Sequence, residues 1–180
     1  MAAIGCSLFD TAIGACGIAW TQQAIAAVQL PEVTREGTLR RMWRACGEVP
    51  QSMPPAFVQQ AIARIQSLLQ GKRDDLQDLP LDLTGVPEFH RRVYEVARAI
   101  PPGEVLTYGE VAKRIGEPGA ARAVGQALGR NPFAPVVPCH RVLAAGGRSG
   151  GFSAEGGADT KLKMLEIEAA RFGGAPGLFD

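Results

Sequence analysis

Short apolar runs separated by turn-forming residues fill the first thirty positions of the chain. Small and β-branched residues dominate there, and breaks at residues 10–14 and 21–23 predict two or three short strands joined as hairpins. The pattern then changes to helical spacing. One helix is predicted over residues 34–46 and another after Pro54-Pro55. Their apolar faces carry Leu39, Met42, Trp43 and Cys46 in the first helix, and Phe57, Ala61, Ile62, Ile65, Leu68 and Leu69 in the second.

A polar, acidic and turn-rich stretch over residues 71–87 interrupts these patterns. It is the best candidate for a domain boundary, so we expect an N-terminal α/β lobe over residues 1–84 and a mostly helical domain over residues 85–180. Together they predict an α+β fold.

Pro87 opens the next predicted helix, which ends before Pro101-Pro102-Gly103. Its inward face is expected to carry Phe89, Val93, Val96 and Ile100. Thr107 and Glu110 have the spacing of a capping box, which predicts a short helix with Val111 and Ile115 on its apolar side. A turn over residues 116–119 and a helix over residues 120–129 follow. Two short helices joined by a glycine-containing turn are typical of a helix-turn-helix.

The helix over residues 120–129 has mostly small side chains, so its backbone can approach another surface closely. Ala121, Val124, Gly125 and Leu128 can face the core, which leaves Arg122, Gln126 and Gly129 outside. A second interpretation is an alanine-rich packing helix with one solvated arginine.

The overall composition is that of a globular protein, with 46% hydrophobic residues, 21% charged residues and a formal net charge of +1. The charge is unevenly distributed. Residues 1–84 hold seven basic and eight acidic residues, whereas residues 89–148 hold nine basic and four acidic ones. A basic excess around the predicted helix-turn-helix favours a phosphate-facing surface, although solvated faces also carry such charge.

The four cysteines are too scattered for a disulfide scaffold, and with two histidines they lack the spacing of a zinc site, so no metal is expected. The N-terminus lacks the basic residues of a secretory signal, and no apolar run approaches the roughly 20 residues that span a bilayer. These features predict a soluble cytoplasmic protein with no membrane association.

The most informative stretch is NPFAPVVPCHRV, residues 131–142, which places Cys139 beside His140. A free thiol is only a few per cent ionised at neutral pH, and an imidazole or a cation such as Arg141 would raise that fraction. Neighbours on a regular strand point to opposite faces. The two side chains can therefore cooperate only if Pro138 bends the chain or a water relays the proton. A buried structural cysteine is the simpler interpretation.

Several spaced motifs resemble the O6-alkylguanine-DNA alkyltransferases, also called methylated-DNA–protein-cysteine methyltransferases. They are PCHRV at residues 138–142, TYGEVA from residue 107, RAVGxAxxxNP over residues 122–132, and a glycine-rich loop followed by KLKMLEIE. The resemblance covers residues 87–169. It implies a ribonuclease-H-like N-terminal lobe and a winged helix-turn-helix in the C-terminal domain.

The resemblance also implies an activity and a set of catalytic residues. The base carrying O6-alkylguanine, or O4-alkylthymine, would be flipped out of double-stranded DNA, and its alkyl group would pass irreversibly to Cys139. His140 would act on Cys139 through a water. A glutamate would orient His140; the motif places it at Glu168, with Glu166 as the rival. Tyr108 would assist flipping and donate a proton to the departing base.

The remaining expected site residues bind DNA or line the lesion pocket. Arg122 would enter the base stack, Asn131 would be a hinge, Arg141 would be a local partner rather than a catalyst, and Ser153 would contact the lesion oxygen. Phe152 stands where some relatives have a tyrosine. The further DNA-contacting residues are Gln126, Ala121, Ala123, Gly125 and Thr107, and the further pocket residues are Pro138 and Val142. The resemblance implies minor-groove contact, no cofactor and a monomer.

Three alternatives compete with this hypothesis. An alkyltransferase-like protein that binds lesions without repairing them would lack the nucleophile, which this chain has. A Cys-His hydrolase would need neither a helix-turn-helix nor Arg122. A purely structural DNA-binding module would leave the PCHRV motif unexplained.

Overall fold

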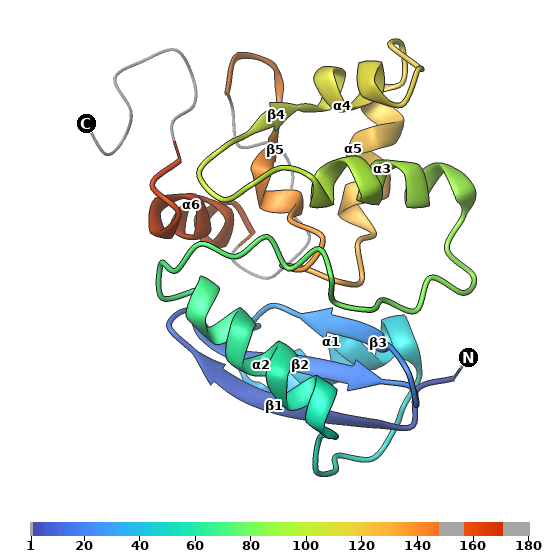
Figure 1. Cartoon of the computed structure of the whole chain (residues 1–180), viewed down its shortest axis with the longest axis vertical. Coiled ribbons are helices and arrows are strands. Elements are labelled where there is room, and N and C mark those ends of the chain that lie inside the picture. Colours follow the sequence, from blue (N-terminus) through green and yellow to red (C-terminus); the bar gives the residue numbers. More distant parts are fainter. Residues whose placement is uncertain (1, 148–156, 171–180) are drawn as a thin grey trace. The chain divides into compact units, whose positions relative to one another are not determined.

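A computed structural model describes residues 2–147 and 157–170 (Figure 1). Within these residues the chain forms two compact units. The first contains residues 2–72, 76–85 and 132–136, and the second contains residues 73–75, 86–131, 137–147 and 157–170. Each unit is thus assembled from segments that are separate in the sequence. The fold is α+β, as predicted.

The first unit is built on a three-stranded antiparallel sheet of β1 (Gly5–Thr11), β2 (Gly14–Trp20) and β3 (Ile25–Gln29), in the order β1-β2-β3. The two predicted hairpins are therefore present. Phe9 pairs with Cys16 across the first hairpin and Ile18 pairs with Val28 across the second. Gly14 closes the first turn with a φ of 123°, a backbone conformation that favours glycine.

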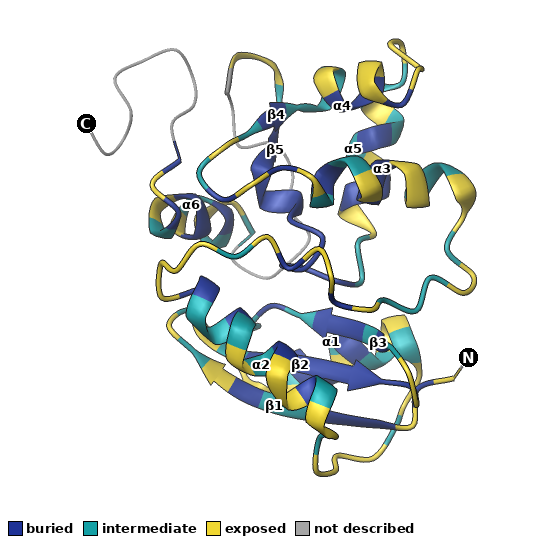
Figure 2. Ribbon diagram, viewed as in Figure 1, coloured by how far each residue is buried: buried dark blue, intermediate teal, exposed yellow. Residues whose placement is uncertain are grey.

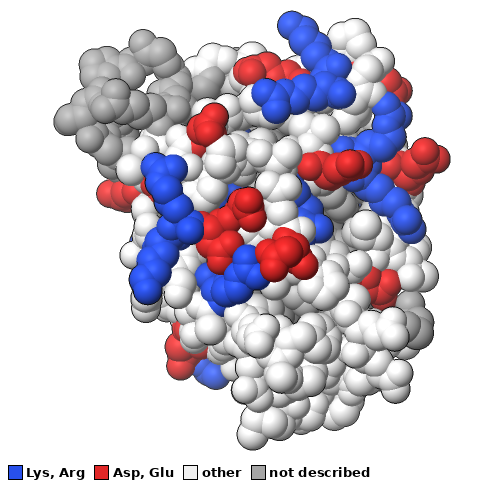
Figure 3. Space-filling model, viewed as in Figure 1, with Lys and Arg blue, Asp and Glu red and all other residues white. Residues whose placement is uncertain are grey.

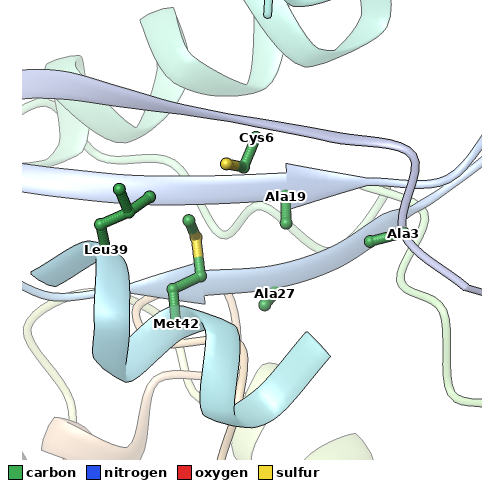
Figure 4. Packing of buried hydrophobic residues seen from close by; sticks show 6 residues of the cluster. All are labelled: Ala3, Cys6, Ala19, Ala27, Leu39 and Met42. Atoms are coloured by element: carbon green, nitrogen blue, oxygen red, sulfur yellow. The ribbon is translucent and has the colours of Figure 1, made fainter. Parts of the chain in front are cut away.

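Two helices cover this sheet, α1 (Arg35–Cys46) and α2 (Ala56–Leu68). Thr34 caps α1, its hydroxyl accepting a hydrogen bond from the Gly37 N–H. Leu39 and Met42 of α1 pack against small residues of the sheet, as Figure 4 shows. The helix α2 contacts β1 on the side of the sheet opposite to α1 (Figure 1).

Two extended segments complete the outer edge of β3. The Ile25 N–H donates to the carbonyl oxygen of Pro80, and the Val28 N–H donates to that of Pro132, each at 2.8 Å. Parallel bridges join the same residues to Leu81 and Phe133. The segment that leads to residue 137 is thus part of the N-terminal unit, which explains why a single cut does not divide the chain.

The second unit contains α3 (Glu88–Arg98), α4 (Tyr108–Arg114), α5 (Ala121–Gly129) and α6 (Gly157–Ile167). Two very short strands, β4 (Leu106–Thr107) and β5 (Val142–Leu143), pair in parallel. The predicted capping box is confirmed, because the Thr107 hydroxyl accepts from the Glu110 N–H while the Glu110 carboxylate accepts from the Thr107 N–H. α3, α4 and α5 pack against one another.

The buried stripe of α3 differs from the sequence prediction. Val93 is buried as expected, but Tyr94 and Ala97 are buried beside it, while Phe89 and Val96 are only partly buried. Figure 2 shows buried, intermediate and exposed stretches along this helix. Because α3 packs against both α4 and α5, its buried face does not coincide with the line of apolar residues in its sequence.

In α5 the structure buries Val124, Ala127 and Leu128, whereas Ala121 and Gly125 are only partly buried. Arg122, Gln126 and Gly129 are exposed, as predicted.

In the described part of the chain no helix is long and apolar enough to cross a membrane. Over the same residues, no group of three or more His, Cys, Asp or Glu side chains could hold a metal ion.

Candidate active site

Cys139 and His140 lie in a single 3-10 turn, Cys139–Arg141, and not in a strand. Pro138 precedes the turn with φ −82° and ψ 68°, and its carbonyl oxygen accepts a hydrogen bond from the Arg141 N–H at 2.9 Å. The chain is therefore bent at this point, which is the condition that the sequence sets for the two side chains to cooperate. Both are buried, Cys139 with 6% and His140 with 0% of its surface exposed.

Glu168 is the carboxylate that holds His140. The Nε2 of His140 lies 2.8 Å from Oε1 of Glu168, and Glu166 is exposed. Because an ionised carboxylate only accepts hydrogen bonds, Nε2 carries the proton. Glu168 comes one residue after the end of α6 at Ile167, so it lies in the turn that follows the helix rather than inside it.

Arg141 forms a bidentate ion pair with the carboxylate of Glu168. Its Nε donates to Oε2 of Glu168 at 3.0 Å and its Nη2 donates to Oε1 at 2.7 Å, while Nη1 donates to the carbonyl oxygen of Ile100. Burial alone would raise the pKa of Glu168, but the bonds from His140 and Arg141 outweigh it and lower the pKa to about 2. Glu168 is therefore a carboxylate at any ordinary pH.

His140 is held as a neutral imidazole. Burial lowers its pKa, although Glu168 opposes the shift. Its Nδ1 is buried and has no hydrogen-bond partner among the described residues. Since Nε2 carries the proton, Nδ1 presents a lone pair, which is what a general base requires.

The thiol of Cys139 is subject to opposing effects. Burial raises its pKa, while a hydrogen bond from the Asn131 side chain and the charge of Lys161 lower it. Hydrogen bonds from the backbone around Cys139 and His140 act in the same direction. Burial is the largest of these effects and the pKa is raised overall, while the surrounding donors and the charge of Lys161 limit that rise.

Lys161 is a site residue that the sequence analysis missed. It is fully buried in α6, its Nζ donates to the carbonyl oxygen of Val142 at 2.7 Å, and Nζ lies 5.7 Å from the centre of the Tyr108 ring. Burial lowers its pKa to about 8. The expectation that Arg141 supplies the cation for Cys139 is corrected, because Glu168 occupies Arg141 and the cation that acts on Cys139 is Lys161.

The signal for Lys161 was present in the sequence. Lys161 precedes Glu168 by seven residues, which places both on the same side of a helix that continues in register.

Asn131 joins α5 to the segment before Cys139. Its Nδ2 donates to the carbonyl oxygen of Val137 at 2.8 Å, and its side chain also bonds the Cys139 thiol. One amide group thus contacts both the backbone and the sulfur of the site.

Tyr108 is half-buried at the start of α4, and burial followed by the proximity of Cys139 raises its pKa. Its hydroxyl therefore keeps its proton and can act as a donor. The Thr107 hydroxyl, expected to contact DNA, accepts the capping bond of α4. Pro138 and Val142 are buried, and Ala123 is partly buried. Phe152 and Ser153 lie outside the described residues.

The basic excess of residues 89–148 is only partly a surface property. Arg141 is buried, and Arg92 pairs with Glu117 at 3.0 Å. On the face seen in Figure 3, basic and acidic side chains are interspersed. The exposed basic residues of α4, α5 and the C-cap of α5 are Lys113, Arg114, Arg122 and Arg130. Positive charge therefore accumulates on the two short helices.

Comparison with known proteins identifies relatives over most of the chain. Residues 88–170 match the family described as 6-O-methylguanine DNA methyltransferase, DNA binding domain. A methylated-DNA–protein-cysteine methyltransferase of Mycolicibacterium paratuberculosis is 45% identical over 71% of this chain and 74% of its own length. One from Mycobacterium tuberculosis is 36% identical over 95% of this chain and 96% of its own.

Solved structures give the same result. The crystal structure of Mycobacterium tuberculosis OGT in complex with DNA has a TM-score of 0.74 at 33% identity, covering 92% of this chain and 93% of that one. The Mycobacterium tuberculosis O6-methylguanine methyltransferase has a TM-score of 0.73 at 36% identity, covering 98% and 99%.

Proposed function

This chain belongs to the methylated-DNA–protein-cysteine methyltransferase family, and we propose that it repairs alkylated DNA by transferring the alkyl group of O6-alkylguanine to Cys139. The observation that carries the proposal is the arrangement of Cys139, His140 and Glu168, with the cation of Lys161 acting on the thiol. A buried thiol with its own base and a nearby cation is suited to nucleophilic attack.

The transfer proceeds as an in-line displacement. His140 Nδ1 accepts the thiol proton through a water, and Glu168 stabilises the resulting imidazolium. The sulfur of Cys139 forms a bond to the alkyl carbon while the bond from that carbon to O6 of guanine breaks. The bonding pair passes to the base, and the Tyr108 hydroxyl donates a proton to it. Guanine is restored and Cys139 becomes a thioether.

The reaction is stoichiometric. A thioether carbon–sulfur bond has no acyl or disulfide character, so neither hydrolysis nor thiol exchange regenerates the nucleophile. Each molecule therefore acts once. The same displacement could also remove the alkyl group of O4-alkylthymine, which is a second candidate substrate. The reaction needs Cys139 as a reduced thiol, which favours action in the cytoplasm. The proposed displacement requires neither a metal ion nor a cofactor.

We assign DNA binding to a winged helix-turn-helix that contains α4 and α5. The small residues Ala121, Ala123 and Gly125 let α5 approach the minor groove, and Gln126 and Arg122 project from its exposed side. The target base leaves the duplex, as base chemistry generally requires, and Arg122 fills its place. Asn131 acts as the hinge after α5. Phe152 and Ser153 complete the lesion pocket, and the monomer is the active form.

We assign a ribonuclease-H-like arrangement to the N-terminal lobe, most of which lies within residues 1–84, with residues 73–75 and 132–136 exchanged between the two units. The antiparallel strands β1 to β3 flanked by α1 and α2 support this assignment.

The function is tested by incubating the protein with a duplex that contains O6-methylguanine. Mass spectrometry of the peptide that carries Cys139 is expected to show a gain of about 14 mass units, because a methyl group replaces the thiol hydrogen. A matched duplex with unmodified guanine is the control. An unmodified peptide together with an intact lesion would refute the proposed activity, whereas lesion binding without transfer would indicate a lesion-binding protein.

Arg122→Ala is expected to slow repair of duplex DNA by roughly 10- to 100-fold, because removing a group that holds the flipped state costs about 1–3 kcal/mol. Reaction with the free modified base should be unaffected, since that base needs no flipping. The measurement is the second-order rate constant for each substrate. Arg40→Ala, at an exposed arginine of α1 in the N-terminal unit, is the matched control and should leave both rate constants unchanged. Equal losses on both substrates would contradict the role of Arg122.

A further inference from the structure

The last turn of α5 closes without the left-handed glycine that follows many helices. Arg130 is the C-cap residue with φ −102° and ψ 11°, and its N–H bonds the carbonyl oxygens of Gln126 and Ala127 at the long distances of 3.2 and 3.3 Å. In contrast, α4 is followed by Gly116 with φ 79°, and two further backbone bonds close its last turn. The backbone closure at the end of α5 is therefore weaker than that of α4, and a side-chain donor from another helix can strengthen it.

Tyr94 of α3 supplies that partner. Its hydroxyl donates to the carbonyl oxygen of Ala127 at 2.8 Å, and both residues are buried. Burial raises the pKa of Tyr94, so the hydroxyl remains a donor throughout the working pH range. The carbonyl oxygen of Ala127 therefore accepts two hydrogen bonds, a long one from the Arg130 N–H at 3.3 Å and a shorter one from Tyr94, and the bond from Tyr94 is the one that ties it to another helix.

Arg92, two residues earlier on α3, acts in the same way on α4. Its Nη2 donates to the carbonyl oxygen of Ile115, the C-cap residue of α4, and its Nη1 pairs with Glu117 in the following turn. One helix thus supplies side-chain donors to the C-terminal ends of both short helices. The bond from Tyr94 matters more, because α4 also has its own glycine-closed end.

We propose that Tyr94 is a positioning residue for the reaction with duplex DNA, because its bond to Ala127 fixes α5 relative to Asn131. Asn131 follows the capped end directly, and its N–H donates to the carbonyl oxygen of Leu128 at 3.1 Å. The same residue bonds Val137 and the Cys139 thiol. Fixing the last turn of α5 therefore fixes the relation between the helix that carries Arg122 and the nucleophile. This role rests on the proposed function.

Tyr94→Phe tests the role, because it removes the hydroxyl and keeps the ring in the core. The second-order rate constant with duplex O6-methylguanine is expected to fall about 10-fold, the effect of losing one buried hydrogen bond. The rate constant with free O6-methylguanine is expected to stay within about 2-fold, because that substrate does not need α5. Both rates are divided by the fraction of protein that can be alkylated at saturation, so that unfolded protein does not contribute.

Thr38→Val is the matched control. It removes a buried hydroxyl that accepts from the Glu32 N–H at 2.9 Å in the N-terminal unit, and it should leave the ratio of the two rates unchanged. Tyr94→Trp retains a buried N–H donor and should recover part of the duplex rate.

An unchanged ratio in Tyr94→Phe, whether both rates fall or neither does, would overturn the positioning role. A wild-type protein that is inert toward both substrates would overturn the proposed function, and this role with it.

Discussion

Cys139→Ser is expected to abolish alkyl transfer, with the rate falling on the order of 10⁴-fold or more, while the protein still binds a duplex that contains O6-methylguanine. Serine is nearly isosteric with cysteine, so the packing around the 3-10 turn is kept. Its hydroxyl remains protonated where a thiol can ionise, and neither the Asn131 bond nor the charge of Lys161 compensates for that difference.

Two measurements check this result. Mass spectrometry of the peptide that carries residue 139 reports transfer, and fluorescence anisotropy with labelled duplexes reports binding to lesion and unmodified DNA. Cys16→Ser is the matched control, because Cys16 is also fully buried but lies in β2 of the N-terminal unit; its transfer rate should equal that of the wild type. Methylation of the serine variant, or loss of its preference for the lesion, would contradict the assignment of Cys139.

Glu168→Gln is expected to have the second largest effect, since one carboxylate holds both His140 and Arg141. The substitution leaves the guanidinium of Arg141 buried without its counter-charge, which costs about 3–5 kcal/mol of unfolding free energy. It also removes the charge that stabilises the imidazolium of His140, so the transfer rate should fall by roughly 10²- to 10⁴-fold.

The carboxylate of Glu168 also makes the unfolding free energy depend on pH. Its pKa is about 2 in the folded protein and 4.5 as the ordinary value, so folding favours the ionised form. The stabilisation, on the order of 3 kcal/mol, is complete above about pH 4.5 and is lost as the pH falls toward 2. Urea unfolding at each pH should therefore show that the unfolding free energy of the wild type falls between pH 5 and 2. The fall in Glu168→Gln should be smaller by about 3 kcal/mol.

Glu166→Gln provides the control for both effects. Glu166 is exposed and two residues away, so its substitution should change the unfolding free energy by less than about 0.5 kcal/mol and leave the rate intact. If Glu166→Gln inactivated the protein and Glu168→Gln did not, the assignment of the orienting carboxylate would be wrong.

The elements that local chemistry determines were predictable from the sequence. Thr107 and Glu110 form the capping box that their spacing indicates, and the turn residues of the first two strands lie where the strands break. The adjacency of Cys139 and His140 also predicted a thiol site, with a bend at Pro138 as its condition.

What the sequence could not supply depends on tertiary packing. Tyr94 and Ala97 are buried because α3 has two neighbouring helices, a fact that no periodicity within α3 contains. A lysine is exposed by default, so although its spacing places Lys161 on the side of Glu168, its burial follows from the surroundings of α6. The motif places the orienting glutamate at Glu168, and the contact with His140 distinguishes it from the rival Glu166.

The glycines of α5 have a thermodynamic consequence. Among the described residues, a methyl group at Gly129 would meet no atom within 4 Å, and one at Gly125 would meet only the Tyr108 ring, at an ordinary contact distance of 4.0 Å. A glycine in the interior of a helix, as Gly125 is, costs about 0.5–1 kcal/mol relative to alanine. The packing of α5 does not require this loss of stability. The bare backbone instead leaves room for another molecule to approach α5, and that room exists before the molecule binds.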